Sequence, residues 1–281
     1  MEPLIEGIRG KVLRPGDEGY EKARRVYNAD IDRKPAAIVT CADVADVMTA
    51  VNYAREHRLK VAIRGGGHSA PGFGTCDGGL VIDLAQMNGI RVDAEQRRAR
   101  AEGGCTWGDL DHATHAFGLA TPGGVISTTG IAGLTTGGGF GYLSRRHGLA
   151  CDNLVAADVV TADGKLRTAD AAHNADLFWA IRGGGGNFGV LTSLQFKLHP
   201  LRQMFAGPLL YPPEQAAGAL RLYRDFMRSA PRAMSAFFAF LIVPPGPPFP
   251  EPLWNKTLPG IMCSYAGDAD EGERVTEPLR K

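Results

Sequence analysis

The sequence of 281 residues lacks the signals of several large protein classes. It has no apolar stretch of about 18 residues, so no membrane span is expected. Its formal net charge of +1 provides no field that would attract nucleic acid or an anionic membrane. Its first residues lack the basic start and apolar run of a signal peptide, which favours a cytoplasmic location. Neither nucleic acid nor a membrane is therefore expected as a partner, and the oligomeric state is left open.

Cysteine and metal-ligand patterns are also lacking. The five cysteines lie at positions 41, 76, 105, 151 and 263. None forms a Cys-x-x-Cys pair, so the spacing indicates neither a zinc site nor a disulfide framework. The acidic and histidine residues within 109–115 share the polar side of one short predicted helix, and we interpret them as solvated side chains. No metal site is predicted.

The sequence also lacks the two common nucleotide-binding motifs, the P-loop and the Rossmann fingerprint. No G-x-x-x-x-G-K-[ST] segment occurs, which excludes a P-loop nucleotidase. The segment GGGNFG at 184–189 matches G-x-G-x-x-G by its letters. A Rossmann fingerprint needs a strand before the motif, a helix after it and an acidic residue about 20 positions later. Here the predicted helix comes first and the strand follows, so we reject that reading.

Glycine, by contrast, is abundant. The chain has 37 glycines, about twice the typical share of ~7%. They have no fixed period, which excludes collagen and solenoid folds. They cluster instead at 65–67, 72–79, 123–124, 130–141 and 183–189. Such clusters between periodic segments indicate a backbone that wraps closely around a ligand or another part of the chain.

The first cluster follows a predicted strand–helix–strand unit. Residues 36–40 and 60–64 have the composition of strands, and apolar residues spaced i, i+3, i+4 and i+7 from Val44 predict a helix between them. The pattern Thr40-x-x-Asp43 is expected to begin this helix. The unit brings the glycine loop to the end of a strand, where ligands often bind.

The later segments indicate a change from one domain to another near residue 200. Residues 190–198 alternate as in a half-buried strand. Near 200–205 glycine becomes rarer and proline more frequent, and strands around a helix at 212–230 follow. A second domain is therefore expected to begin there. Its last helix, from about 268, has no obvious surface to pack on, so the chain is expected to be truncated relative to a complete protein.

The loop RGGGHS and the stretch at 128–141 are candidate anion sites. Successive glycine N–H groups at a strand end can bind a phosphate that a Cβ atom would keep away. The second stretch adds further N–H donors and threonine hydroxyls. Each loop alone has the simpler reading of a tight surface turn. Together with the third run at 183–189, the two loops favour the diphosphate of a dinucleotide.

Taken in order, these motifs resemble a known family. The segments are RGGGHS, TPGG, GIAGLTTGGGFGYLSRRHGLACDNL and DLFWAIRGGGGNFGVLTSLQFKLHP. They resemble the flavin-linked oxidases of the berberine-bridge-enzyme type, within the vanillyl-alcohol-oxidase superfamily, over roughly residues 30–281. The resemblance implies an α+β fold: a PCMH-type FAD-binding domain of two α/β subdomains at 1–203, then an incomplete substrate domain at 204–281 with an antiparallel sheet and flanking helices.

The resemblance also implies cofactor-binding residues. In the family, the histidine of the glycine loop is bonded covalently to the 8α-methyl group of the flavin, and that residue is His68 here. Its alternative is a structural histidine. The implied contacts fall in three groups: Arg64, Gly65, Gly66, Gly67, His68 and Ser69 along the diphosphate; Thr129, Gly130, Gly133 and Gly141 in a second flavin-contacting loop; and Val190 at the adenine.

The family also has a second flavin anchor and a catalytic base, and this sequence has no residue that corresponds to either. Many family members have a second anchor, a cysteine about eleven residues before the glycine run, but that position is Ile126 here. One covalent link to FAD is therefore expected, with no cysteinyl link. The family's catalytic base lies in the C-terminal third, beyond this chain, so no catalytic residue is predicted. Tyr142 follows the glycine run and is expected either to border the flavin or to be an ordinary packing residue.

The implied function is that of an FAD-dependent oxidoreductase. It takes a hydride from a C–H bond next to oxygen or nitrogen in a small molecule, which is an alcohol, a sugar or an amine. Dioxygen is then the expected electron acceptor, giving hydrogen peroxide. The alternatives are a flavin dehydrogenase with another acceptor and a catalytically silent FAD-binding module.

Overall fold

The computed structural model describes residues 6–280 of the chain, and the fold divides into two compact units. The first unit comprises the residues up to Gly141 together with Leu149–Pro200. The second comprises Tyr142–Gly148 and the residues from Leu201 onward. Among residues 6–280, no helix has the length and apolar character needed to cross a membrane.

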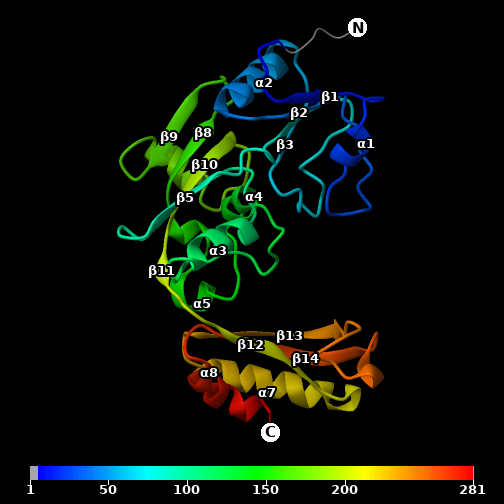
Figure 1. Ribbon diagram of the computed structural model, residues 1–281, viewed down its shortest axis with the longest axis vertical. Helices are drawn as coiled ribbons and strands as arrows, with labels where there is room; N and C mark the ends of the chain where they lie inside the picture. The colour runs from blue at the N-terminus through cyan, green and yellow to red at the C-terminus, as the bar shows by residue number, and fades with distance from the viewer. Residues whose placement is uncertain (1–5, 281) are drawn as a thin grey trace. The chain divides into compact units, whose positions relative to one another are not determined.

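The first unit contains a mixed four-stranded sheet in the order β1-β2-β4-β3 (Figure 1). Strands β2 and β3 run parallel to β4, and β1 runs antiparallel to β2. The strands are β1 (Lys11–Leu13), β2 (Ala37–Thr40), β3 (Val61–Arg64) and β4 (Leu80–Asp83). Helices α2 (Val44–Glu56) and α1 (Tyr20–Ala23) pack on its two faces, so every residue of β4 is buried.

Helix α2 corrects one expectation. Its N-cap is Asp43, whose carboxylate accepts a hydrogen bond from the N–H of Asp46. Thr40 is the last residue of β2 and pairs with Asp83, so it cannot also cap a helix. The buried Asp46 carboxylate in turn accepts from the N–H groups of Arg9, Gly10 and Ala42. The predicted cap was therefore three residues too early.

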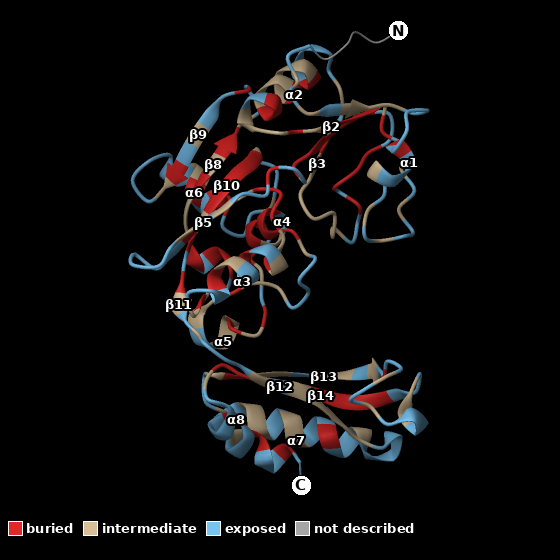
Figure 2. Ribbon diagram, viewed as in Figure 1, coloured by how far each residue is buried: buried red, intermediate tan, exposed pale blue. Residues whose placement is uncertain are grey.

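The second sheet of this unit is antiparallel, in the order β5-β6-β10-β8-β9. Its strands are β5 (Ile90–Asp93), β6 (Arg98–Glu102), β8 (Leu154–Val160), β9 (Leu166–Asp170) and β10 (Val190–Lys197). Helices α3 (Trp107–His115), α4 (Ile131–Thr136) and α6 (Ala175–Ala180) contribute to its core. Figure 2 shows β8 and β10 largely buried and the edge strand β9 largely exposed. Strands β7 (Leu119–Ala120) and β11 (His199–Pro200) form a separate two-stranded antiparallel sheet.

Strand β10 is buried more completely than its alternating pattern predicts. Residues 190–194 are all buried. Leu191 and Leu194 belong to the core of the antiparallel sheet, whereas Val190 packs with α2 in the core of the mixed sheet. The register against β8 shifts between Leu191 and Ser193. The half-buried prediction is therefore wrong for the first part of the strand, because that part contacts both cores.

The second unit is a three-stranded antiparallel sheet, β12-β14-β13, with helices on one face (Figure 1). Its elements are β12 (Phe205–Leu210), α7 (Ala216–Ser229), β13 (Met234–Ile242), β14 (Thr257–Tyr265) and α8 (Ala269–Thr276). Val275 of α8 and Leu279 just after it pack into the core of this unit. The expectation that the last helix has nothing to pack on was wrong.

The segment 142–148 crosses from the glycine run into the second unit. It contains the short helix α5 (Ser144–His147). The Arg145 guanidinium donates to the carbonyl of Met234 at 2.6 Å, and the Arg146 guanidinium donates to the carbonyl of Ala266 at 2.6 Å. Tyr142 stacks on Phe237 of β13 with ring centroids 6.5 Å apart. Tyr142 is half-buried and packs against the sheet of this unit, and packing was one of its two expected roles.

Candidate functional site

Four of the five glycine clusters meet around one cavity of the first unit, with a volume of about 510 Å³. The first loop contributes residues 63–71, 73 and 74; the second stretch contributes residues 129, 130, 133, 134, 136 and 137; the third run contributes Gly185 and Gly186. The third run is tied to the second by a hydrogen bond from the N–H of Gly185 to the carbonyl of Thr136 at 2.8 Å. Segments more than 100 residues apart thus form one wall.

The first two loops touch backbone to backbone. A Cβ atom on Gly66 would lie 2.2 Å from the amide nitrogen of Gly130, and a Cβ atom on Gly130 would lie 2.3 Å from the amide nitrogen of Gly66. No side chain fits at either position without separating the loops. Glycine is therefore required here by the approach of two main chains to each other.

The first loop also exposes a row of backbone donors. Within residues 6–280, the N–H groups of residues 65–69 have no hydrogen-bond acceptor. Successive N–H groups with one glycine in the left-handed region, here Gly67 with φ of 70°, form a concave site for an anion. Because backbone donors are costly to leave unpaired, this loop has the donor set that a phosphate group would satisfy.

Arg64 lines the cavity, but its guanidinium group is already occupied. It pairs with the Asp83 carboxylate at 2.5 Å and donates to the carbonyls of Ala23 and Arg25. Both partners of the ion pair are largely buried. The aliphatic part of the Arg64 side chain lies 3.7 Å from where a Cβ atom of Gly67 would be. The side chain of Arg64 therefore packs against the loop, and its guanidinium is occupied by partners within the protein.

His68 lies at the edge of the cavity in a defined orientation. Its Nε2 atom is 2.9 Å from the Thr128 hydroxyl, and its Nδ1 atom is 3.3 Å from the Thr129 hydroxyl. Its ring stacks on that of Tyr27, with centroids 4.0 Å apart and an interplanar angle of 18°. Burial lowers the pKa of His68 below its ordinary value, which favours the neutral imidazole.

The remaining predicted residues divide between two places. Thr129, Gly130 and Gly133 line the same cavity as the His68 loop, together with Ser69. Gly141 packs elsewhere: a Cβ atom on it would lie 2.1 Å from the carbonyl oxygen of Gly123. Gly141 is not among the residues that line this cavity, and its backbone lies against the glycine segment at 123–124.

Val190 lines a second cavity of about 490 Å³. This cavity is bordered by α2, by the end of β8 and by the third glycine run, and it shares Ile63 and Gly186 with the first. Its lining is mostly aliphatic, with Arg55 and Arg58 as its charged members. The two cavities adjoin, so a ligand longer than either one can extend through both.

Sequence reasoning missed several of the residues that build this site. Gly185 and Gly186 line the cavity although neither was named as a site residue; their run was rejected only as a Rossmann motif and was otherwise counted in favour of a dinucleotide. Leu134 lines the cavity from within α4. Tyr27 lies outside every motif, and no local pattern connects it with His68.

Comparison with known proteins identifies relatives that resemble this chain in sequence and fold. Residues 35–170 match the FAD binding domain family. An FAD-linked oxidoreductase of Dictyostelium discoideum is 37% identical over 99% of this chain and 59% of its own length. The crystal structure of 6-hydroxy-D-nicotine oxidase from Arthrobacter nicotinovorans superposes with a TM-score of 0.89 at 33% identity, over 100% of this chain and 60% of that one. The BBE-like 1 protein of Physcomitrella patens gives a TM-score of 0.86 at 26% identity, covering 98% of this chain and 58% of that one.

These matches confirm the family resemblance and the predicted fold class. They also confirm FAD as the cofactor that this kind of domain binds. The chain spans about three-fifths of the length of these relatives.

Proposed function

Since this chain contains an FAD binding domain and its homologues are FAD-linked oxidoreductases, we propose that it holds FAD along the two adjoining cavities for hydride transfer from a small molecule. The observation that carries the proposal is the row of unpaired backbone donors beside an oriented histidine. Two independent features of the cavity support it, namely its fit to a diphosphate and its fit to the two ends of the cofactor.

The diphosphate is assigned to the first glycine loop. The N–H groups of residues 65–69 supply donors, and the glycines leave room for phosphate oxygens to approach the main chain. Gly130 and Thr129 line the cavity from the facing loop, and the backbone of Gly66 lies directly against that of Gly130. The formal charge of the diphosphate is then compensated by backbone dipoles, because Arg64 is engaged with Asp83.

The adenine end is assigned to the second cavity. Val190 lines it, as the family resemblance implies, and aliphatic residues of α2, β3 and β8 supply an apolar surface for a flat ring. The shared residues Ile63 and Gly186 mark the passage between the two ends. Gly186 has open space where a Cβ atom would be, which keeps this passage free.

His68 is the proposed point of covalent attachment. Its neutral imidazole is a nucleophile held at the edge of the cavity, and attachment through nitrogen withdraws electron density from the flavin ring, which favours hydride acceptance. The five cysteines are buried, and the residues described as lining either cavity include none of them. A single link through His68 is therefore proposed.

FAD, when bound, supplies the hydride acceptor, and the chain supplies its position. The substrate is a small molecule with a C–H bond next to nitrogen or oxygen, and dioxygen is the proposed final acceptor. The name of the nicotine oxidase relative puts amines first among the candidates, ahead of alcohols and sugars. The described lining of the two cavities contains no carboxylate, so the base that accepts the substrate proton is assigned to a residue outside them.

The test uses the purified protein. We expect a yellow protein whose colour stays with the precipitate in acid, and we expect His68→Ala to release the flavin on the same treatment. Anaerobic addition of amines, alcohols and sugars in turn identifies the substrate class by bleaching, and the return of colour in air identifies an oxidase. A colourless protein that does not take up added FAD would contradict the proposal, and acid-stable flavin in His68→Ala would contradict the attachment site.

A further inference from the structure

A segment ahead of the FAD binding domain match holds the His68 loop. Residues 24–34, which we call the N-terminal strap, make three kinds of contact with it. The N–H of Tyr27 donates to the carbonyl of Gly67 at 3.0 Å, and the side-chain amide of Asn28 donates to the carbonyl of Ala70 at 2.9 Å. Arg33 donates to the carbonyl of Gly72 at 2.6 Å. The strap is thus attached along the length of the loop.

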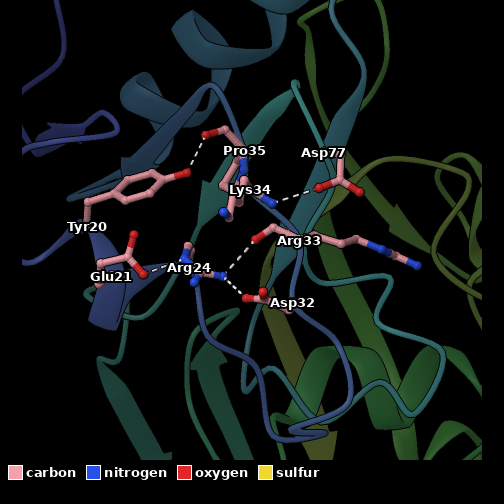
Figure 3. Close-up of polar contacts among 8 residues, drawn as sticks. All are labelled: Tyr20, Glu21, Arg24, Asp32, Arg33, Lys34, Pro35 and Asp77. Carbon is pink, nitrogen blue, oxygen red and sulfur yellow. Dashed lines mark hydrogen bonds and ion pairs between the residues drawn. The ribbon is translucent and has the colours of Figure 1, made fainter.

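The two ends of the strap are fastened to each other (Figure 3). The Arg24 guanidinium contacts Asp32 and lies 2.8 Å from Glu21, and it also donates to the carbonyl of Arg33. The N–H of Lys34 donates to the Asp77 carboxylate at 2.8 Å, beyond the far end of the loop. These contacts close the strap into a ring, so its middle, which carries Tyr27, has a fixed position over His68.

Three side chains then surround the His68 imidazole. The Tyr27 ring lies on one of its faces, nearly parallel to it. The hydroxyls of Thr128 and Thr129 each contact one ring nitrogen, in the plane where an imidazole makes hydrogen bonds. Stacking fixes the plane of the ring, and the two hydroxyls fix its rotation within that plane.

We propose that Tyr27, Thr128 and Thr129 form a clamp that presents the Nδ1 atom of His68 for bonding to the flavin. This inference rests on the covalent attachment proposed above. In this arrangement, Tyr27 is a positioning residue, since it acts on His68 and not on the flavin.

The choice of Nδ1 comes from the two distances. The contact of Nε2 with Thr128 is the shorter, at 2.9 Å against 3.3 Å for Nδ1 with Thr129. Donation of an Nε2–H proton to the Thr128 hydroxyl leaves the lone pair on Nδ1. Thr129, the partner of Nδ1, lines the cavity. The nucleophilic nitrogen therefore lies on the cavity side.

The attachment balances as follows. The bond from Nδ1 to the 8α carbon forms, one C–H bond of that methyl group breaks, and the Nε2–H proton leaves through the Thr128 hydroxyl to solvent. The histidine and the methyl group together lose two hydrogens with two electrons. Dioxygen is the oxidant that takes them, and it leaves as hydrogen peroxide.

The first experiment measures attachment in the whole chain produced without bound flavin and mixed with FAD. The fraction of flavin that stays with acid-precipitated protein is followed with time in Tyr27→Ala, Tyr27→Phe and the unmodified protein. Tyr27→Ala is expected to slow attachment about three- to tenfold, the value of one aromatic stack. Tyr27→Phe keeps the stacked ring and is expected to stay within about twofold. Trp179→Ala, which removes a ring that is 80% exposed in the same unit, is the matched control.

The second experiment identifies the bonded nitrogen. The histidyl-flavin released by complete digestion is compared with synthetic Nδ1- and Nε2-linked standards. The Nδ1 isomer is expected in the unmodified protein, and Thr128→Val is expected to produce a mixture. An Nε2 isomer in the unmodified protein, or equal attachment rates in Tyr27→Ala and Trp179→Ala, would overturn the clamp alone. Absence of acid-stable flavin in the unmodified protein, with FAD still bound, would overturn the attachment itself and the clamp with it.

Discussion

The two units of this chain hold their loops by opposite means. In the first unit, the glycine loops contact each other through main-chain atoms, as Gly66 and Gly130 do, and a row of N–H groups has no acceptor within the described residues. In the second, the segment 142–148 is held by side chains, with Arg145 and Arg146 donating to carbonyl groups. The first arrangement keeps donors available for a ligand, and the second uses its donors for the fold. Substitutions should therefore have different effects in the two places.

The largest expected effect is at the base of the first loop. Asp83→Ala leaves the buried Arg64 guanidinium without its carboxylate partner, and the free energy of unfolding should fall by about 3–5 kcal/mol. Urea denaturation of the flavin-free protein measures it. Asp225→Ala, which removes an exposed ion pair with Arg224 in the second unit, is the control and should cost at most about 1 kcal/mol. Equal losses in the two variants would mean that the Arg64 pair does not support the loop.

The next effect concerns the contact between the loops. Gly66→Ala and Gly130→Ala each force two main chains apart, so we expect a loss of about 1–3 kcal/mol in stability together with weaker FAD binding. Calorimetric titration with FAD and thermal unfolding check both. Gly133 lines the same cavity, but a Cβ atom at this position would have no neighbouring atom within 4 Å. Gly133→Ala is therefore the control, and its free energy of unfolding should not fall. Unchanged FAD binding in Gly66→Ala would show that the loops can separate freely.

A smaller effect is expected where side chains hold the backbone. Arg145→Ala removes the donor to the carbonyls of Ala230, Pro231 and Met234. Because Arg145 is only half-buried, water can replace part of these contacts, and we expect a loss of about 1 kcal/mol. Thermal unfolding measures it, with Arg145→Lys retaining part of the stability. A loss as large as that of Asp83→Ala would remove the distinction between the units.

The smallest effect has the opposite sign. Gly218 lies inside α7 with open space around its missing Cβ atom. Gly218→Ala should raise the free energy of unfolding by about 0.5–1 kcal/mol, since alanine loses less backbone entropy in a helix. Urea denaturation tests this, and a destabilised Gly218→Ala variant would contradict the assignment of glycine sensitivity to the first unit.

Prediction from sequence succeeded where the signal is local. The predicted strand–helix–strand unit forms β2, α2 and β3, and the glycine clusters marked the segments that line the cavity. The clusters are readable because a glycine-rich loop has few other physical explanations. The family resemblance added the role of FAD, which glycine spacing alone could not provide.

Prediction failed where a residue's partner is distant in sequence. Thr40 fits a helix cap until its pairing with Asp83 is known, and no local pattern reveals that the Arg64 guanidinium pairs with Asp83. Val190 follows an alternating pattern, yet it joins a second core through a contact that no periodicity encodes. Each of these outcomes depends on pairing between strands and loops, and a single sequence does not reveal it.

The N-terminal strap has a practical consequence for anyone who wishes to transplant this module. A boundary drawn at residue 35, where the match to the FAD binding domain begins, would discard Tyr27 and also Arg33, which grips the carbonyl of Gly72. Such an excised piece would retain the glycine loops of the cavity and His68 itself, yet its imidazole would lose the stacked ring that fixes its plane. A chimaera intended to carry tethered flavin should therefore start upstream of Tyr20, whose hydroxyl anchors the strap's far end at Pro35.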